Sequence, residues 1–154
     1  MQLAMSQKSR DLRLNALISE AAKYDCKVWA VIMESNIVLM NKDILLNPVD
    51  ESLLGALSNQ YCYLGVCNDR LYFSIIKTLN VEEEKYSMII PFSEIEKVEI
   101  KSGIITKRRI LVLHFSDGDK LRVSVTSNAI GTDIKDQKEN ADRLFELVSK
   151  INNA

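Results

Sequence analysis

The residues of this chain that could carry out catalysis are its one histidine, His114, and three cysteines, Cys26, Cys62 and Cys67. A nucleophilic thiol needs a base within hydrogen-bond reach. Cys67 has no histidine near it in the sequence, so a Cys67–His114 pair would require the fold to bring two distant segments together. A small hydrolase or redox enzyme built on that pair is the enzymatic hypothesis. The prediction set against it is that the protein is not an enzyme.

The remaining polar residues do not predict a cofactor or a metal. One histidine and scattered cysteines lack the spacing of zinc ligands, and the five glycines are isolated, unlike those of a phosphate-binding loop. The acidic run 82–84 has no accompanying oxygen-ligand spacing, so we interpret it as part of a solvated loop. Cys62 and Cys67 are five residues apart on one expected strand, which directs them to opposite faces. We expect reduced thiols, no cofactor and no metal.

The strongest candidate for a binding site is the basic segment 101–109. It contains two adjacent isoleucines bracketed by four cations, Lys101, Lys107, Arg108 and Arg109. Such a segment could contact anionic lipid headgroups, with the isoleucines entering the membrane interface. At about 1 kcal/mol per cation near an anionic membrane, four charges would need a second anchoring signal. The alternative, which the sequence favours, is that the cations are solvated strand ends and the isoleucines belong to the core.

A second candidate surface is an amphipathic helix predicted over residues 6–24. Leu14, Leu17, Ile18 and Ala21 follow the i, i+3, i+4, i+7 spacing of one apolar stripe. The stripe either contacts a partner or a second copy of the chain, or it docks on the rest of the protein. Both alternatives remain open at this point. We divide the chain into a helical segment, 1–26, and a main domain, 27–154.

The composition sets the class of protein. The chain has 154 residues, 47% of them hydrophobic, and a net charge of −1. A balance this close to neutral argues against a dedicated nucleic-acid binder. No apolar run reaches the roughly 18 residues of a membrane helix, and no signal peptide opens the chain. We therefore expect a cytoplasmic protein, with the inner face of a membrane as an alternative site of action.

The main domain reads as a series of strands followed by one helix. Alternation of apolar and polar residues predicts most of the strands, and Asn68-Asp69 and Asp117-Gly118 mark tight turns between them. The acidic stretch 79–85 is expected to be a loop, and 43–58 has mixed signals, with a short helix near 50–54. An apolar stripe predicts the closing helix, with Asp136 as its cap. The expected strands cover 28–33, 61–67, 71–77, 86–92, 96–101, 109–115 and 120–125, and the helix covers 137–151.

Two segments also resemble a known family. Residues 66–73, V-C-N-D-R-L-Y-F, are similar to the "V-T-N-x-R-L-x-F" hairpin of bacterial pleckstrin-homology-like (PH-like) and GRAM-like domains. Residues 90–98 are similar to their "I-P-Y-x-x-I-x-x-V" segment, although Cys67 stands where Thr or Ser is usual. The resemblance implies a mainly β fold, α+β by content. Two near-orthogonal antiparallel sheets would form a partly open barrel, capped by the C-terminal helix and preceded by the N-terminal one.

Members of that family are mostly binding modules, but a fold does not determine a ligand. We predict a non-catalytic module for protein interaction or for self-association through exposed strand edges. The alternative is a peripheral membrane module that contacts anionic headgroups through the basic segment. The expected partners are therefore a protein, a second copy or an anionic membrane, and not a nucleic acid.

Overall fold

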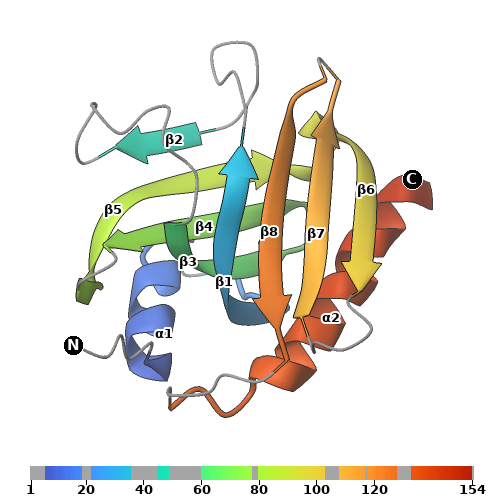
Figure 1. The fold of residues 1–154 in the computed structure, drawn as a ribbon. Coiled ribbons are helices and arrows are strands. Elements are labelled where there is room, and N and C mark those ends of the chain that lie inside the picture. The colour runs from blue at the N-terminus through green and yellow to red at the C-terminus, as the bar shows by residue number, and fades with distance from the viewer. Residues whose placement is uncertain are drawn as a thin grey trace.

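The computed structural model describes residues 6–18, 22–35, 45–48, 60–77, 80–102, 108–116, 118–127 and 133–153. Within these residues, no helix is long and apolar enough to cross a membrane. Short 3₁₀ turns, η3 and η4, follow β5 and α2 (Figure 1). The elements are α1 (Gln7–Asn15), β1 (Cys26–Ser35), β2 (Leu45–Pro48), β3 (Gln60–Cys67), β4 (Arg70–Lys77), β5 (Asn80–Pro91), η3 (Phe92–Glu94), β6 (Ile95–Ser102), β7 (Arg108–Phe115), β8 (Lys120–Thr126), α2 (Gln137–Ser149) and η4 (Lys150–Asn153).

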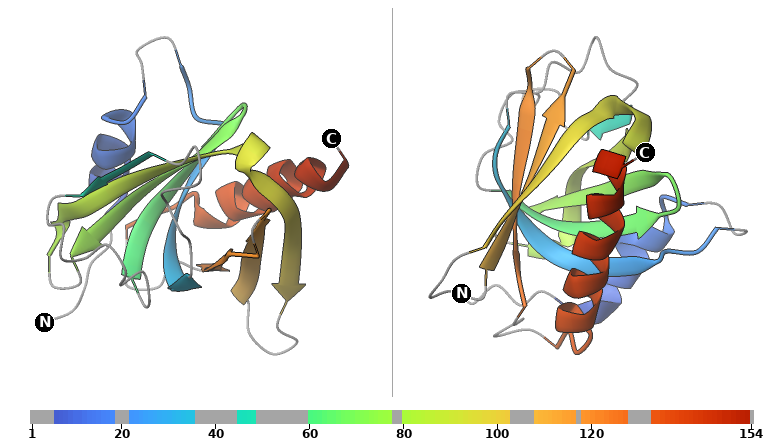
Figure 2. Two further views of the ribbon diagram at one scale, coloured as in Figure 1. Left: turned by 90° about the horizontal axis from the view of Figure 1, so that it is seen from above. Right: turned by 90° about the vertical axis from the view of Figure 1, so that its right-hand side faces the viewer.

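The strands form one antiparallel sheet in the order β2-β5-β4-β3-β1-β8-β7-β6. β1 pairs with β3 along its first part and with β8 along its second, with a register shift between Ile32 and Glu34. Bulges of this kind bend a strand. The half of the sheet that contains β3, β4 and β5 therefore runs across the half that contains β8, β7 and β6 (Figures 1 and 2). The two sheets implied by the resemblance are halves of one continuous sheet, which stays open at β2 and β6.

The main core lies between the two halves and α2. Alternate residues of β1 and of β3 to β8 point into it, together with the apolar residues of α2. Figure 2 shows α2 lying across the open side. Fully burying one such side chain contributes about 1.5–3 kcal/mol. The predicted closing helix is thus present as α2 and η4. The helix residues that enter the core are Ala141, Leu144, Phe145 and Val148.

Helix α1 is shorter than the predicted 6–24 segment. It begins after Ser6, whose Oγ accepts a 3.0 Å hydrogen bond from the Ser9 amide, and it ends at Asn15. The Tyr24 hydroxyl donates to the carbonyl of Leu14, one of the carbonyls that a helix end leaves without an intrahelical partner. Desolvation raises the pKa of Tyr24, so its hydroxyl stays protonated as a donor. Tertiary contacts, rather than the apolar stripe, decide where this helix ends.

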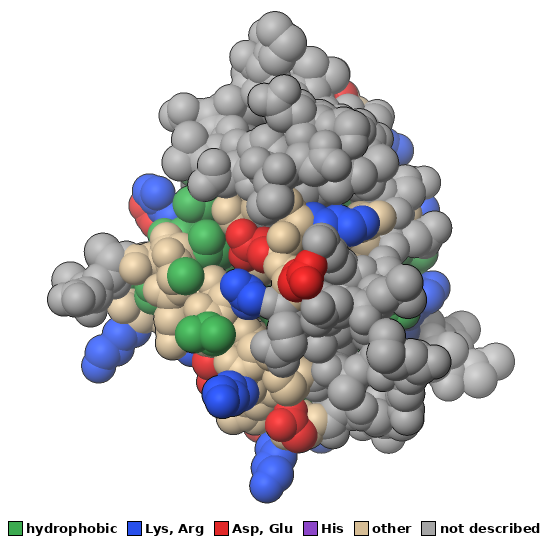
Figure 3. All heavy atoms as spheres, turned by 90° about the vertical axis from the view of Figure 1, so that its left-hand side faces the viewer, with side chains coloured by type: hydrophobic (Ala, Val, Ile, Leu, Met, Phe, Trp, Pro, Cys, Tyr) green, Lys and Arg blue, Asp and Glu red, His purple; other side chains and the backbone are tan. Residues whose placement is uncertain are grey.

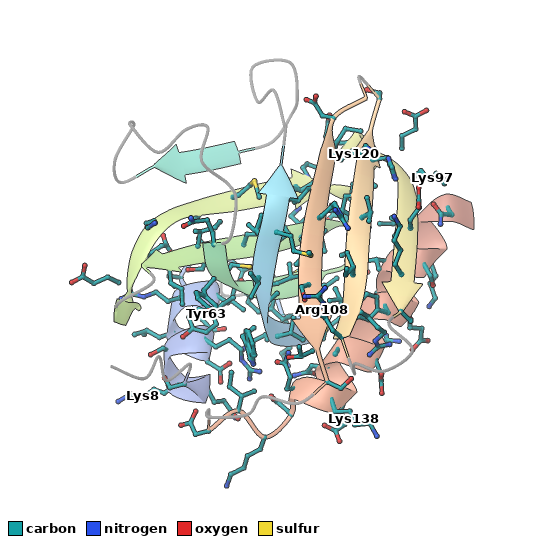
Figure 4. All side chains as sticks on the ribbon, in the orientation of Figure 1. Lys8, Tyr63, Lys97, Arg108, Lys120 and Lys138 are labelled. Carbon is teal, nitrogen blue, oxygen red and sulfur yellow. The ribbon has the colours of Figure 1, made fainter. Side chains whose placement is uncertain are left out.

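A second hydrophobic cluster lies on the outer surface of the sheet, and α1 packs on the sheet through this cluster. Leu14 is fully buried there against Tyr63 and Tyr72 of β3 and β4. Figure 4 shows Tyr63 beside α1. On this side of the molecule, Figure 3 shows small groups of exposed hydrophobic side chains among charged ones. The buried members of the cluster are Leu14, Tyr63, Cys67, Tyr72, Ile76 and Ile134.

A buried arginine ties α1 to the start of α2. Arg10 is only 2% exposed, and its guanidinium donates to both carboxylate oxygens of Asp136, at 2.7 and 3.1 Å, and to the carbonyl of Lys27. Asp136 precedes α2, as predicted for a cap, but its side chain makes no capping hydrogen bond. Gln137 and Asn140 instead hold α2, because they donate to the carbonyls of Trp29 and Lys27 on β1.

The acidic stretch 79–85 is not a loop, as predicted, but largely part of β5. β5 begins at Asn80 and pairs with β4 through two irregularities near Ile76. Ser74 on β4 donates a 2.5 Å hydrogen bond from its Oγ to Glu84. Pairing across the hairpin therefore outweighs the low strand propensity of a glutamate run. The short helix expected near 50–54 lies outside the described residues.

Candidate functional site

The structure separates the four cations of the basic segment. Lys101 lies near the end of β6 and Arg108 begins β7, and both are exposed. Lys107 and the two isoleucines lie outside the described residues. Arg109 points to the opposite face from Arg108, because successive side chains of a strand alternate. The predicted four-cation site is thus not a single cluster among the described residues.

Arg109 contacts the closing helix. Its Nη2 donates to Asp142 Oδ1 at 2.6 Å, and its guanidinium carbon lies 4.2 Å from the centroid of the Phe145 ring. This is a cation–π contact combined with an ion pair at the rim of the core. Arg109 therefore serves the packing of α2 on β7, which leaves Lys101 and Arg108 as the predicted cations on the opposite face.

That face is the outer surface of β6, β7 and β8, and it gathers cations that the sequence analysis missed. On β7, Leu111, Leu113 and Phe115 point into the core, so the intervening residues point outward. The same alternation operates on β6 and β8. Figure 4 labels Lys97, Arg108 and Lys120 on these strands, with α2 behind them. We call the following set the cationic face: Lys97, Lys101, Arg108, Lys120 and Arg122.

The strand register arranges these residues in rows across the sheet. Adjacent strands are about 4.8 Å apart, and alternate residues of one strand are about 6.6 Å apart. Three of the rows contain neighbours from three strands, and one contains neighbours from two. The rows are Lys97–His114–Lys120, Glu99–Val112–Arg122, Lys101–Ile110–Ser124 and, on two strands, Arg108–Thr126.

Glu99 is the acidic residue within these rows, and its carboxylate already interacts with two of its neighbours. Its Oε1 lies 2.7 Å from His114 Nε2 and 3.6 Å from Lys97 Nζ. Desolvation opposes ionisation of Glu99, but the hydrogen bond with His114 and the charges of Lys97 and Lys101 lower its pKa. His114 is thus a strand residue paired with a neighbour. Glu99 remains ionised, and its carboxylate contacts the side chains of Lys97 and His114 at the centre of the face.

The face is positive although the chain as a whole is not. Five Lys or Arg against Glu99 give the rows of these three strands a net charge of +4, whereas the whole chain carries −1. Charge is therefore distributed asymmetrically over the molecule, which favours one orientation of an approaching anionic partner.

The side chains between the cations are recessed. Val112, in the centre of the face, is 3% exposed, and Ile110 and His114 are half-buried. Long charged side chains cover apolar surface with their aliphatic stems. The outer surface of these strands therefore presents charge over a shielded apolar floor.

The structure does not bring Cys67 and His114 together. Cys67 belongs to β3 and the outer cluster, whereas His114 is on β7, and β1 and β8 lie between those strands. Three strand spacings correspond to about 14 Å along the sheet. Desolvation raises the pKa of Cys67, which disfavours the reactive thiolate. Cys67 and His114 therefore do not form a pair in this structure, and the part of the chain that the structure describes holds no group of three potential metal ligands.

The residues predicted to contact a partner lie instead at the junction of α1 and the sheet. Leu14 is fully buried, and Leu17 and Ile18 are partly buried against the same outer cluster. Ala21 lies outside the described residues. Leu14 therefore packs against the protein's own sheet, which was the second of the two alternatives for this helix.

Comparisons with known proteins add a likeness in shape. No protein-family model matches the chain, and no curated protein matches it in sequence. Among solved structures, it is similar to "the hSac2 domain from human phosphoinositide phosphatase Sac2". The two have 12% sequence identity and a TM-score of 0.49 over 96% of this chain and 80% of that chain. A similarity at this level carries no information on ligand or activity.

Proposed function

We propose that the chain is a non-catalytic, PH-like binding module that docks an acidic segment of a partner protein on the cationic face. From β3 onward, the antiparallel strands followed by a closing helix agree with what the resemblance to PH-like domains implies, which supports this proposal. The observation that carries the proposal is the gathering of five cations from three adjacent strands on the outer face of a neutral protein.

An extended acidic segment fits the spacing of this face. Alternate side chains of an extended chain are about 6.6 Å apart, so Lys97 and Lys101, which have Glu99 between them on β6, are about 13 Å apart. Two acidic side chains four residues apart in an extended segment could therefore pair with both cations. Electrostatic complementarity of this kind speeds association and fixes orientation, and it makes binding sensitive to salt.

A membrane fits the face less well. The apolar residues Ile110 and Val112 are recessed among the charged side chains and could not enter a lipid interface. Charge alone would supply about 1 kcal/mol per cation, and the net charge of the face is only +4. Binding to anionic vesicles would thus be weak without a further anchor.

The test uses a fluorescein-labelled polyglutamate peptide and fluorescence anisotropy. Lys101→Glu together with Arg108→Glu should weaken binding by about thirtyfold, because two attractions of about 0.5 kcal/mol each become two repulsions of about the same size, a total change of about 2 kcal/mol. The matched control is Lys8→Glu with Lys138→Glu, which changes the net charge equally at exposed positions on α1 and α2. Arg109→Ala is a second control, because that residue faces α2.

Three outcomes decide the proposal. A loss confined to the Lys101 and Arg108 variant supports it, and equal losses in the control variant would show general attraction to charge and refute it. In a parallel arm, vesicles of equimolar phosphatidylcholine and phosphatidylserine replace the peptide. Tight vesicle binding that depends on Lys101 and Arg108, without peptide binding, would replace the protein partner by a membrane.

A further inference from the structure

Strand β6 is an edge of the sheet, and a side chain closes part of that edge. The Val98 amide donates to Asn152 Oδ1 at 2.8 Å, and Asn152 Nδ2 donates to the Val98 carbonyl at 2.9 Å. A carboxamide that accepts and donates in this way copies the peptide group of an adjacent strand. Figure 2 shows the C-terminal turn that carries Asn152, η4, beside β6.

The bonds to Asn152 also reveal which way the rest of β6 faces. They show that the backbone groups of Val98 point away from β7. Because this direction alternates along an antiparallel strand, the backbone groups of Ile100 and Ser102 point to the same edge. Ile100 is 38% exposed, one of two large hydrophobic residues so exposed in the described part of the chain. Beyond Asn152, the edge therefore offers an apolar side chain and outward-facing peptide groups.

A second copy of β6 fits this edge in one antiparallel register. A two-fold axis at Ile100 places Glu99 of each copy opposite Lys101 of the other, and Ile100 opposite Ile100. An axis at Glu99 would place lysine opposite lysine and glutamate opposite glutamate, which is unfavourable. An axis at Val98 would also pair unlike charges, but Asn152 occupies that position. Charge complementarity thus favours the register centred on Ile100.

We propose that the β6 edge is an interface for a second copy of this chain and that Asn152 holds it closed. In the register centred on Ile100, Ser102 of one copy lies opposite Val98 of the other, where Asn152 sits. The ladder can extend past Ile100 only when Asn152 leaves Val98. The C-terminal turn therefore sets the monomer–dimer equilibrium, and this inference is independent of the acidic-segment function.

The first experiment measures the mass of the protein by light scattering after size exclusion, over a concentration series without peptide. The wild-type chain should remain a monomer, whereas Asn152→Ala and Asn152→Ser should each dimerise. Lys150→Ala changes an exposed residue of the same turn and should leave the monomer intact. Circular dichroism checks that each variant keeps its β content, so that aggregation of unfolded chain is recognised.

The second experiment tests the register in the Asn152→Ala background. Glu99→Lys or Lys101→Glu alone should weaken the dimer by about tenfold, because each creates two like-charge pairs across the axis. The two changes together should restore it. Monomeric Asn152 variants with native circular dichroism would overturn the proposal, as would a wild type that dimerises equally well. A dimer indifferent to both single charge changes would also overturn it.

Discussion

Replacing Gly65 by alanine tests how α1 and the segment before β1 are seated on the sheet. Gly65 lies on β3 beneath Tyr24, and a Cβ built there would come within 2.5 Å of Tyr24 Cε1 and 3.3 Å of Leu14 Cδ1. The first distance is far inside van der Waals contact, so the ring must move. Tyr24 also packs edge-to-face on Tyr72, with ring centroids 5.5 Å apart, and donates to the Leu14 carbonyl. Displacing the ring therefore disturbs several contacts at once.

The expected change in the free energy of unfolding is the sum of contributions of opposite sign. Overpacking of a filled site costs about 1–3 kcal/mol, and loss of the tyrosine hydrogen bond adds about 1 kcal/mol. Replacing glycine by alanine reduces the entropy of the unfolded chain, which offsets about 0.4–1 kcal/mol. We expect a net loss of about 2 kcal/mol in the free energy of unfolding. For a domain of this size, that corresponds to a fall in Tm of roughly 4–8 °C.

Thermal unfolding followed by circular dichroism measures the fall, and a double-mutant cycle identifies its cause. In a Tyr24→Ala background, the Gly65→Ala change should cost almost nothing, because the clashing ring is gone. Gly118→Ala is the matched control. Its positive φ of 87° penalises any side chain, but a Cβ there meets no atom within 4 Å, so its cost should not depend on Tyr24. A Gly65→Ala cost that persists without Tyr24 would refute the proposed seating of α1.

Three further predictions concern the Arg10–Asp136 ion pair and the buried thiols. Arg10→Met should lower the free energy of unfolding in urea by about 2 kcal/mol, because Asp136 loses its bidentate partner. The hydrogen bond from Arg10 holds the pKa of Asp136 below its usual range, so this contribution is present above about pH 4 and is lost as the pH falls through the lowered pKa. A urea-midpoint series down to about pH 2 should show that loss, and Asp136→Asn should lack it. Desolvation raises the pKa of Cys26 to about 12 and also raises the pKa of Cys62 and of Cys67. Ellman's reagent at about pH 8 should therefore modify the thiols only after unfolding, and a fast-reacting thiol in the folded protein would contradict their placement.

Much of the fold from Gln60 onward follows from local signals. Alternation defines most strands, and turn residues such as Asn68-Asp69 and Gly118 mark where the chain reverses. The apolar stripe of α2 is equally local. These features depend on neighbours within a few positions, which a sequence displays directly. The hairpin of β3 with β4, that of β7 with β8, and α2 are confirmed for this reason.

Features set by distant pairs were not predictable in the same way. Arg10 and Asp136 are 126 positions apart, and no local pattern marks them as partners. Lys97, Lys120 and Arg122 lie in the segments 96–101 and 120–125, which alternation predicted as strands. Their alternation was visible, but the cationic face emerges only when the order β8-β7-β6 is known. The predicted hairpin around Gly118 could have placed Arg122 beside Val112. The position of β6 beside β7, in contrast, could be learned only from the tertiary structure.

The outer faces of the two halves of the sheet differ in the side chains that they present, and this difference supports the proposed binding surface. On β3 and β4 several outward residues are apolar or aromatic, among them Tyr63, Tyr72 and Ile76, and Leu14 of α1 packs into the same cluster. Such a face exposed to water would associate indiscriminately. On β6, β7 and β8 the outward positions carry cations that keep the face soluble without a covering helix. A surface that must stay accessible to a partner needs charged outward residues, because positive charge repels basic partners and attracts an acidic one. If reversing Lys101 and Arg108 changed no binding event, the charges would serve solubility alone, and the reasoning from uncovered face to binding site would fail.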